Sequence, residues 1–300
     1  MRHFLALALL ALLSGCEASS VNTVPADLGS PVERSAILAQ DIGPVVVEKR
    51  LAATWSVPLS GLLNLDHPKA VAAGIEDRDE PIDIYVYILR HPDAGTYIVD
   101  SGVSERFGLE DGNPDLSALV TAAMNMDALD IKLSTAELAD EVGAIDGVFL
   151  SHIHMDHIMG LTDLPPATPV YIGPGDASFK AVLNAATRGS TDRLLAVQGE
   201  LREWQFDNEK VLDVFGDGSV FAIHSPGHTP GSTAYLVMST TGPQLMLGDA
   251  THTRWGWENG VEPGSFSADV AQSAESLAWL VQLAQDMPEI VVHPGHQSLP

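Results

Sequence analysis

The sequence contains a single cysteine, Cys16, among 300 residues. A disulfide within the chain needs two thiols, so none can stabilise this fold. The shortage also excludes the cysteine-rich zinc sites, in which several thiolates surround one ion. A metal centre in this protein therefore depends on imidazole and carboxylate ligands.

Basic residues are also scarce. The 15 lysines and arginines stand against 40 aspartates and glutamates, which gives a formal net charge of -25. So large a negative charge repels the phosphates of nucleic acids and anionic lipid surfaces. We therefore expect no nucleic-acid partner. With 45% apolar residues, the chain is long enough to bury the core of one large domain.

The sequence lacks an apolar run long enough to cross a bilayer as a folded helix. The run at residues 4–13 follows Met1-Arg2-His3 and is too short for a membrane span, but it suits the apolar part of an export signal. We therefore expect a chain that is exported through a cleavable N-terminal signal.

The residues Leu13-Ser14-Gly15-Cys16 resemble a bacterial lipobox. The resemblance implies that residues 1–15 are a lipoprotein signal peptide and that Cys16 becomes the lipidated first residue. Glu17, rather than aspartate, follows the cysteine, which is typical of delivery to the outer membrane. We expect a bacterial cell-envelope protein at the periplasmic face of the outer membrane, attached to the membrane only through a lipid anchor on Cys16. The alternative is an ordinary signal peptide in which Cys16 is incidental.

The segment that starts at this cysteine, residues 16–35, is polar and lacks a hydrophobic period. It contains Pro25, Gly29 and Pro31. Such a composition predicts a flexible tether. We therefore place the folded domain at residues 36–300.

The domain combines strands and helices. Strands are predicted where β-branched and aromatic residues lie between turn residues, at residues 45–55, 82–90, 96–102, 147–152, 168–173, 219–228, 232–238, 243–250 and 289–297. Helices are predicted from helical spacing of apolar residues and from N-cap residues, at residues 134–143, 175–188 and 267–287. Ser134 is the expected N-cap of the first helix, and Pro288 ends the last.

The stretch SHIHMDHIMG, residues 151–160, places three histidines and an aspartate within six positions, directly after an apolar strand. His152 and His154 are two residues apart, so on an extended segment they point to the same side. Asp156 and His157 follow a turn of the chain and face a second point nearby. Imidazole and carboxylate groups are the ligands of Zn²⁺ and neighbouring first-row metals.

One loop cannot complete two coordination spheres, so further ligands are expected at the ends of later strands. Three candidates are present there: His228 in SPGHTPG, Asp249 in LGDA and His296 in HPGHQ. Independent candidates that occur in order at strand ends make an accidental match to the loop motif improbable.

The loop motif and the three later residues, taken in order, resemble the metallo-β-lactamase superfamily of metal-dependent hydrolases. The resemblance runs from about residue 80 to residue 300 and includes Asp100 in YIVDSG. It implies an α+β fold, the αββα sandwich, in which two mixed β-sheets pack face to face, helices cover the outer faces and the metals lie at one edge.

The resemblance also assigns the ligands of two divalent metal ions, with Zn²⁺ expected in both sites. Carried over by position, the ligands are His152, His154 and His228 for the first ion, Asp156, His157 and His296 for the second, and Asp249 as the bridge between them.

The remaining histidines are expected to be surface or core residues; they include His3, His67, His91 and His224. His293 is the second candidate for the last ligand position. We prefer His296 because it follows Gly295 in the turn after the strand. Asp100 is expected to support a ligand rather than to bind metal itself.

Asp249 favours a bridged dinuclear centre and argues against a true β-lactamase, whose pattern lacks a carboxylate there. The resemblance implies hydrolysis by a hydroxide that bridges the metals, since such ions lower the pKa of water towards about 7. Asp156 would pass a proton to the leaving group. The expected catalytic residues are Asp156, Asp249 and His252.

The spacing of the later ligands most resembles the N-acyl-homoserine lactone lactonases and the related organophosphate hydrolases. Many lactonases have a tyrosine three residues after the bridging aspartate, where this chain has His252. A histidine there is more like the organophosphate branch. His252 either polarises a substrate carbonyl or is an ordinary loop residue.

We expect a metal-dependent hydrolase that opens a lactone or cleaves an ester, with a small apolar ester, lactone or phosphotriester as substrate. Four aromatic residues either wall an apolar pocket or pack in the core: Trp204, Phe206, Trp255 and Trp257. The alternatives are an organophosphate hydrolase of the same fold and a non-catalytic zinc-binding lipoprotein. The sequence leaves open a homodimer and a lid at residues 187–207.

Overall fold

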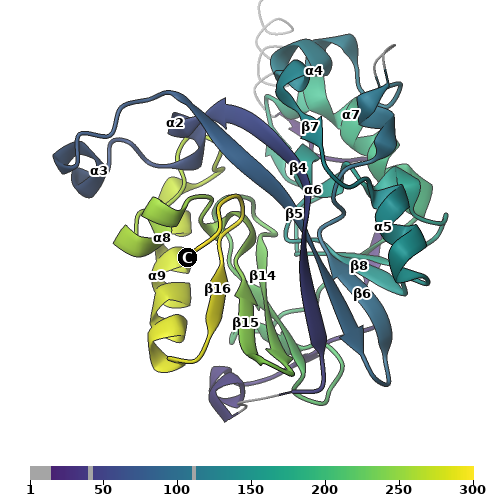
Figure 1. The fold of residues 1–300 in the computed structure, drawn as a ribbon, viewed down its shortest axis with the longest axis vertical. Helices are drawn as coiled ribbons and strands as arrows, with labels where there is room; N and C mark the ends of the chain where they lie inside the picture. The colour runs from purple at the N-terminus through teal and green to yellow at the C-terminus, as the bar shows by residue number, and fades with distance from the viewer. Residues whose placement is uncertain (1–14, 40–42, 110–112) are drawn as a thin grey trace, which may run out of the picture.

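Two β-sheets pack face to face, and helices cover their outer faces (Figure 1). The computed structural model describes residues 15–39, 43–109 and 113–300, so residues 1–14 of the predicted signal peptide lie outside the described part. Both sheets contain parallel and antiparallel pairs. The predicted αββα sandwich of two mixed sheets is therefore confirmed.

The first sheet has eight strands. In spatial order they are β2 (Thr23–Pro25), β11 (Leu201–Glu203), β9 (Val170–Ile172), β8 (Gly147–Phe149), β6 (Gly95–Val99), β5 (Asp79–His91), β4 (Val46–Pro58) and β7 (Asp130–Ile131). Pairing is parallel from β2 to β6 and antiparallel from β6 to β7. Because the parallel strands end at one edge, the loops that follow them meet there.

The second sheet has six strands. In spatial order they are β16 (Val291–His293), β15 (Gly242–Met246), β14 (Thr233–Ser239), β13 (Val220–His224), β12 (Val211–Asp213) and β3 (Ser30–Pro31). Only β15 and β16 pair in parallel. Their carboxyl ends reach the same edge of the sandwich as the loop after β8, since Asp249 and His296, which follow these strands, lie within 4.8 Å of donor atoms from that loop.

Aromatic side chains fill the space between the two sheets. The Phe149 ring lies 4.8 Å from the Tyr97 ring and 5.7 Å from the Tyr235 ring. Trp204 stacks on Tyr171 at 4.8 Å and is buried. Fully burying such rings contributes roughly 1.5–3 kcal/mol each. Trp204 is therefore a core residue and does not wall a substrate pocket.

Helices lie outside both sheets, and two short helices extend from the loop between β4 and β5 (Figure 1). On the side of the first sheet are α4 (Ala118–Ala123), α5 (Thr135–Val142) and α7 (Asn184–Leu195). The shorter helices α2 (Leu59–Leu62), α3 (Pro68–Ala72), α6 (Met155–Ile158) and α8 (Arg254–Asn259) lie near one edge, and α9 (Val270–Asp286) packs on the second sheet.

The helix predicted at 134–143 is confirmed. Ser134 accepts a hydrogen bond from the Glu137 backbone N–H, and the Glu137 side chain accepts one in return from the Ser134 N–H. This capping box satisfies two N–H groups that the helix itself leaves unpaired. The helix predicted at 267–287 is confirmed as α9, and the predicted strands coincide with β4, β5, β6, β8, β9, β13, β14, β15 and β16.

The helix predicted at 175–188 is wrong in position. Gly175 has a left-handed backbone with φ of 76°, which a helix does not accept. The chain first forms the short strand β10 (Lys180–Ala181), and α7 begins only at Asn184 and continues to Leu195. Residues 187–207 are thus part of α7 and β11 and do not form a separate lid.

The flexible tether predicted at 16–35 is also wrong. β1 (Cys16–Glu17) pairs with β10, β2 extends the first sheet beside β11, and β3 extends the second beside β12. The Asp27 carboxylate accepts hydrogen bonds from the side chains of Tyr171 and Arg202. Sheet edges leave N–H and C=O groups unpaired, and this segment satisfies them despite its weak local strand signal.

Among the residues that the structure describes, no helix combines the length and the apolar character that a bilayer span requires.

The docked N-terminal segment predicts a measurable contribution to stability. A chain that begins at residue 33 should unfold at least about 3 °C below one that begins at Cys16, because both sheets lose an edge strand. It should also show a red-shifted tryptophan emission, since Leu28 and Gly29 cover Trp204. Thermal unfolding followed by fluorescence checks both. Coincident unfolding curves would mean that the segment is a free tether after all.

Candidate metal centre

The loop after β8 carries the first group of site residues. The chain leaves the buried strand at Phe149, and α6 begins after His154, which occupies the N-cap position. His152 is buried, whereas His154 and Asp156 retain some exposure. The change from extended chain to helix places Asp156 and His157 in a second donor group, although the rings of His152 and His157 remain 4.1 Å apart.

The structure brings all seven predicted ligands together in two groups. In each group, one donor atom per residue lies within 4.8 Å of all the others. The first group is His152, His154, His228 and Asp249, and the second is Asp156, His157, Asp249 and His296. Asp249 belongs to both groups, which is the position that a bridging carboxylate requires.

The spacing of the donor atoms suits two metal ions. Asp249 Oδ2 lies 3.6 Å from His152 Nε2, 3.3 Å from His228 Nε2 and 3.4 Å from His157 Nε2. Its second oxygen, Oδ1, lies 3.3 Å from His296 Nε2. Two ligands at about 2.1 Å from a tetrahedral Zn²⁺ are roughly 3.4 Å apart, so the distances match.

Several buried polar atoms of the site have no hydrogen-bond partner. His152 Nε2, His157 Nε2 and Asp249 Oδ1 are buried without a hydrogen-bond partner. His154 Nδ1 and His228 Nε2 face each other at 2.8 Å. Leaving such groups unsatisfied costs about 1–3 kcal/mol each. Divalent cations would satisfy all of them, so the residues fit the two ions that the motif predicts.

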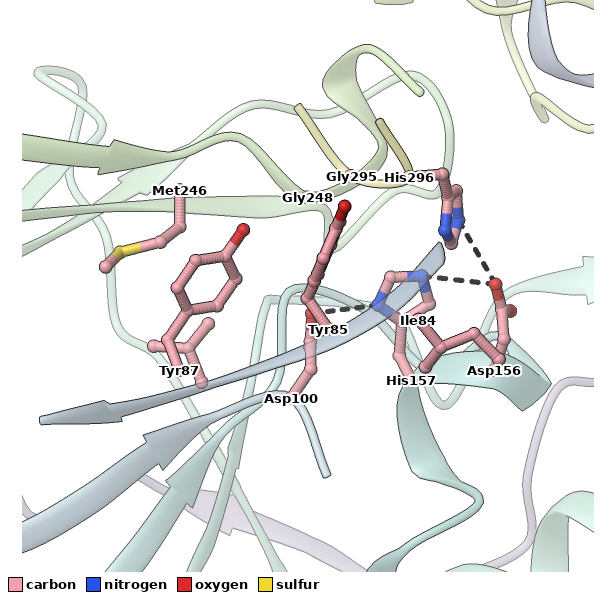
Figure 2. Close-up of a pocket in the computed structure, with 11 residues that line it drawn as sticks. Ile84, Tyr85, Tyr87, Asp100, Asp156, His157, Met246, Gly248, Gly295 and His296 are labelled. Atoms are coloured by element: carbon pink, nitrogen blue, oxygen red, sulfur yellow. Dashed lines mark hydrogen bonds and ion pairs between the residues drawn. The ribbon is translucent and has the colours of Figure 1, made fainter. Parts of the chain in front are cut away.

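Asp100 supports His157 from behind the centre. Figure 2 shows the His157 ring between Asp100 on one side and Asp156 on the other, with His296 above Asp156. His157 Nδ1 donates to the Asp100 carboxylate at 2.8 Å, which leaves Nε2 free for a metal. Asp100 has φ of 57°, an uncommon left-handed conformation for a residue with a side chain. It fulfils the supporting role expected for it.

His296, the other histidine of the second group, is oriented by a backbone carbonyl, and a hydroxyl group also lies beside His157. His296 Nδ1 donates to the Asp83 carbonyl at 2.9 Å, so its Nε2 points towards Asp156 and Asp249. Ser151 Oγ lies 3.1 Å from Nδ1 of His157 and 3.0 Å from Asp100. Fixed tautomers place a lone pair on each nitrogen that faces the centre.

Proton affinities in the metal-free site follow from burial and from the neighbouring charges. Burial opposes protonation of His296, but the carboxylates of Asp249 and Asp156 outweigh it and raise the pKa of His296 to about 10. Burial and the nearby imidazoles hold the pKa of His152 and His228 well below the ordinary value. Metal binding must therefore displace a proton from His296 but not from His152 or His228.

Asp176 is a buried carboxylate that sequence reasoning missed. Its carboxylate accepts a hydrogen bond from the Ile153 backbone N–H at 3.0 Å. Burial raises the pKa of Asp176 to about 6, although hydrogen bonds from Thr229, Ile153 and Gly231 act to lower it. It thereby ties the loop of His152 to the turn after His228. No short-range pattern marks it, because its partners lie far from it in sequence.

Glycine allows two close approaches around the centre. Gly227 has φ of 139°, and a Cβ there would lie 2.2 Å from the Ser273 backbone nitrogen in α9. A Cβ at Gly295 would lie 2.4 Å from Asp249 Oδ1. The residues that precede His228 and His296 must therefore be glycines for the turns to place these histidines.

His252 also lies at the centre. It is buried, and its Nδ1 donates to the Leu62 carbonyl of α2 at 3.0 Å. Its Nε2 lies 3.0 Å from Asp249 Oδ2, and its ring stacks on His296 at 5.6 Å. The structure thus places His252 beside the Asp249 carboxylate, and its catalytic role stays a prediction.

Four other histidines serve structural purposes, whereas His3 lies outside the described residues. His67 caps α3, and His91 pairs with Asp217. His224 Nε2 lies 2.8 Å from the Pro230 carbonyl. His293, the second candidate for the last ligand position, instead contacts Gln244 at 3.1 Å, so the geometry favours His296.

Comparison with known families assigns the chain. A model of the metallo-beta-lactamase superfamily matches residues 79–296, which include every residue of both donor groups. The chain belongs to the metallo-beta-lactamase superfamily.

Several lactonases are similar to this superfamily member. The N-acyl homoserine lactonase AttM of Azorhizobium caulinodans is 32% identical over 153 residues, which cover 50% of this chain and 57% of that protein. AttM of Rhizobium johnstonii is 27% identical over 224 residues, which cover 73% of this chain and 83% of that protein. The chain thus spans little more than half of the first lactonase.

The fold is shared with solved lactonase structures. The dizinc quorum-quenching lactonase AidC, in complex with a product, superposes with a TM-score of 0.56 over 86% of this chain and 90% of that one. The sequences are 17% identical. This likeness shows a common fold.

The contact between Asp100 and His157 predicts a role in metal affinity. Asp100→Asn should weaken Zn²⁺ binding roughly 10–100-fold, because the amide no longer holds His157 as strongly in the required tautomer. Titration against a chromophoric chelator measures the change. Asp146→Asn is a suitable control, since Asp146 accepts the Thr96 N–H away from the donor groups. Equal affinities for both variants would contradict the supporting role.

Proposed function

We propose that this protein is a metal-dependent hydrolase that opens lactones or cleaves carboxylic esters. The observation that carries the proposal is the buried Asp249 carboxylate, which faces the donor atoms of both groups. A carboxylate shared by two groups supports a dinuclear centre. Membership of the superfamily and similarity to lactonases support the reaction class.

Two divalent ions in such a centre polarise a carbonyl oxygen and lower the pKa of bound water to about 7. Zn²⁺ suits the mixture of imidazole and carboxylate donors. The chain supplies no thiolate near the donor groups, so ions that demand sulfur ligands do not fit.

Asp156 is placed to move a proton. Burial opposes its ionisation, but His157 and His296 lower its pKa below the ordinary value, so it is an anion at neutral pH. The Asp156 side chain is 16% exposed. It can therefore accept the proton of the attacking water and pass it to the alcohol that leaves.

The His252 ring faces the same place, with Nε2 3.0 Å from Asp249 Oδ2. Because Nδ1 donates to the Leu62 carbonyl, the neutral ring offers only a lone pair at Nε2. The neutral ring can orient an attacking water, whereas it can polarise a substrate carbonyl only when it is protonated. A tyrosine would donate instead, so this residue distinguishes the chain from the many lactonases that carry tyrosine.

An apolar wall lies close to the first donor group. Phe266 is 42% exposed and packs against Gly61 of α2. The next residue, Ser267, has its hydroxyl 3.4 Å from His228 Nδ1. An exposed aromatic side chain beside the centre fits the acyl or aryl part of an apolar substrate.

A substrate screen tests the proposed activity on a zinc-loaded chain that begins at residue 17. An N-acyl-homoserine lactone or aryl ester should be hydrolysed, and Asp249→Asn should reduce turnover by about a hundredfold or more. Removal of metal by a chelator should abolish activity, and Zn²⁺ should restore it. Asp286→Asn, at the end of α9, is the matched control.

The other outcomes of the screen separate the alternatives. Preferential hydrolysis of a phosphotriester would identify an organophosphate hydrolase. About two bound metals per chain without turnover of any substrate would instead identify a non-catalytic zinc-binding protein.

We also propose that Cys16 carries a lipid anchor that holds the protein at the periplasmic face of the outer membrane. The lipobox-like residues 13–16 support this location. Cys16 pairs with Ala181, and the next two residues, Val182 and Leu183, are 71% and 70% exposed. An apolar pair beside an anchored residue would face the lipid.

Cys16→Ser tests the anchor. In a Gram-negative host, the wild type should incorporate labelled palmitate and sediment with outer membranes, whereas Cys16→Ser should incorporate none. Because Cys16 is the only cysteine, the label reports on this residue alone. An unlabelled wild type would favour an ordinary signal peptide.

A further inference from the structure

A second cavity lies away from the metal centre, along the edge strand β16. Its volume is about 640 Å³, within the roughly 300–1,000 Å³ of ligand pockets. None of the seven metal-ligand candidates lines it. We call it the β16 groove; its lining residues include Lys49, Trp257, Ile290, Val291, Val292 and His293.

Most residues that line the β16 groove have apolar side chains, although polar atoms contribute about half of its exposed surface. Trp257 and Val292 are half-buried, and Val291 is 49% exposed. Leu299 and Pro288 add further apolar surface. Such a surface at a concave site favours a ligand with an apolar portion, because covering it removes hydrocarbon from water.

Lys49 gives the β16 groove one positive charge. Among the described residues no carboxylate pairs with it, whereas the nearby Arg50 and Arg90 each form an ion pair. The Lys49 ammonium instead lies 3.5 Å from the centre of the Tyr85 ring and donates to Ser298 Oγ at 3.0 Å. Burial lowers the pKa of Lys49 to about 8, although the nearby Asp83 carboxylate acts to raise it, so the ammonium form still predominates at neutral pH.

His293 adds no charge to the groove at neutral pH. Burial and the neighbouring Lys49 ammonium lower the pKa of His293 to about 4. Its Nε2 contacts the Gln244 amide oxygen, and its ring lies 5.3 Å from the Tyr87 ring. A ligand in the groove therefore meets a single cation beside an apolar surface.

We propose that the β16 groove binds an amphiphilic carboxylate, with the carboxylate on the Lys49 ammonium and the apolar tail along β16 and Trp257. One cation neutralises one anionic charge, so the site fits a monoanion better than a phosphate dianion. A neutral or cationic head group leaves Lys49 without an ion-pair partner. The fit to this ligand class does not depend on the metal centre.

The proposed reaction produces a ligand of this class. Hydrolysis of an apolar lactone or ester leaves a carboxylate attached to an apolar chain. The groove thus suits binding of a product or of a related fatty acid. This link rests on the proposed function, whereas carboxylate binding itself does not.

Calorimetric titration with decanoate tests the β16 groove on the zinc-loaded chain, with decanol and decylamine as probes that share the tail. Decanoate should bind with one site per chain. Lys49→Met should weaken it about tenfold or more, since a hydrogen bond to a charged group is lost. Lys49→Arg should retain most of the affinity. Lys132→Met is the control, because Lys132 pairs with Asp130 away from the groove.

The same titration on metal-free protein separates the groove from the metal centre. Binding that survives metal removal and is lost in Lys49→Met supports the proposal. Binding that disappears with the metal, that is unchanged in Lys49→Met, or that is equal for decanol overturns it, as does the absence of decanoate binding. Val291→Asp places a negative charge where the apolar tail would lie, so it should weaken decanoate binding by a similar factor.

Stability and turnover controls complete the test. Thermal unfolding establishes that each variant is folded; Lys49 and Val291 both retain exposed surface, so little destabilisation is expected. Ester and lactone turnover of Lys49→Met should equal that of the wild type. Failure of the groove proposal and failure of the proposed function are therefore separate results.

Discussion

A buried carboxylate among imidazoles is the interaction on which this site depends. Asp249 lies within 3.6 Å of five histidine nitrogens, those of His152, His157, His228, His252 and His296. A buried anion is costly unless cations or donors surround it. The neutral imidazoles of His152 and His228 do not satisfy it, because a nitrogen that faces Asp249 without a proton offers only a lone pair. Metal cations at the centre would accept these lone pairs and balance the charge of the buried carboxylate, so the same donor atoms would then stabilise the site.

Contacts behind the ligands decide which nitrogen faces the centre. Asp100 holds His157, the Asp83 carbonyl holds His296, and the Leu62 carbonyl holds His252. These partners come from the first sheet and from α2, whereas Asp249 and His296 follow strands of the second. The centre therefore requires that both sheets are packed correctly, and the aromatic core around Phe149 supplies that packing.

The N-terminal segment is part of the fold. Strands β2 and β3 close one edge of each sheet, and β1 fixes Cys16 beside β10. A lipid on Cys16 would therefore hold the domain directly at the membrane, with little freedom to swing away. Polar composition and prolines suggested a tether, but unpaired backbone groups at both sheet edges favour strand formation by almost any extended segment. Local composition carries no information about such distant partners.

The sequence by itself indicated the fold class and the seven residues of the two donor groups through the resemblance of its motifs to the superfamily, and it indicated the helix that Ser134 caps through short-range spacing. Only the tertiary structure decided the position of α7, the pairing of β1, β2 and β3, and the place of His252. It also revealed Asp176 and the β16 groove. In these cases the partners are far apart along the chain: 190 positions separate His252 from Leu62, and 213 separate His296 from Asp83. Hydrogen bonds and packing over such separations form only when the sheets meet, so no local pattern encodes them.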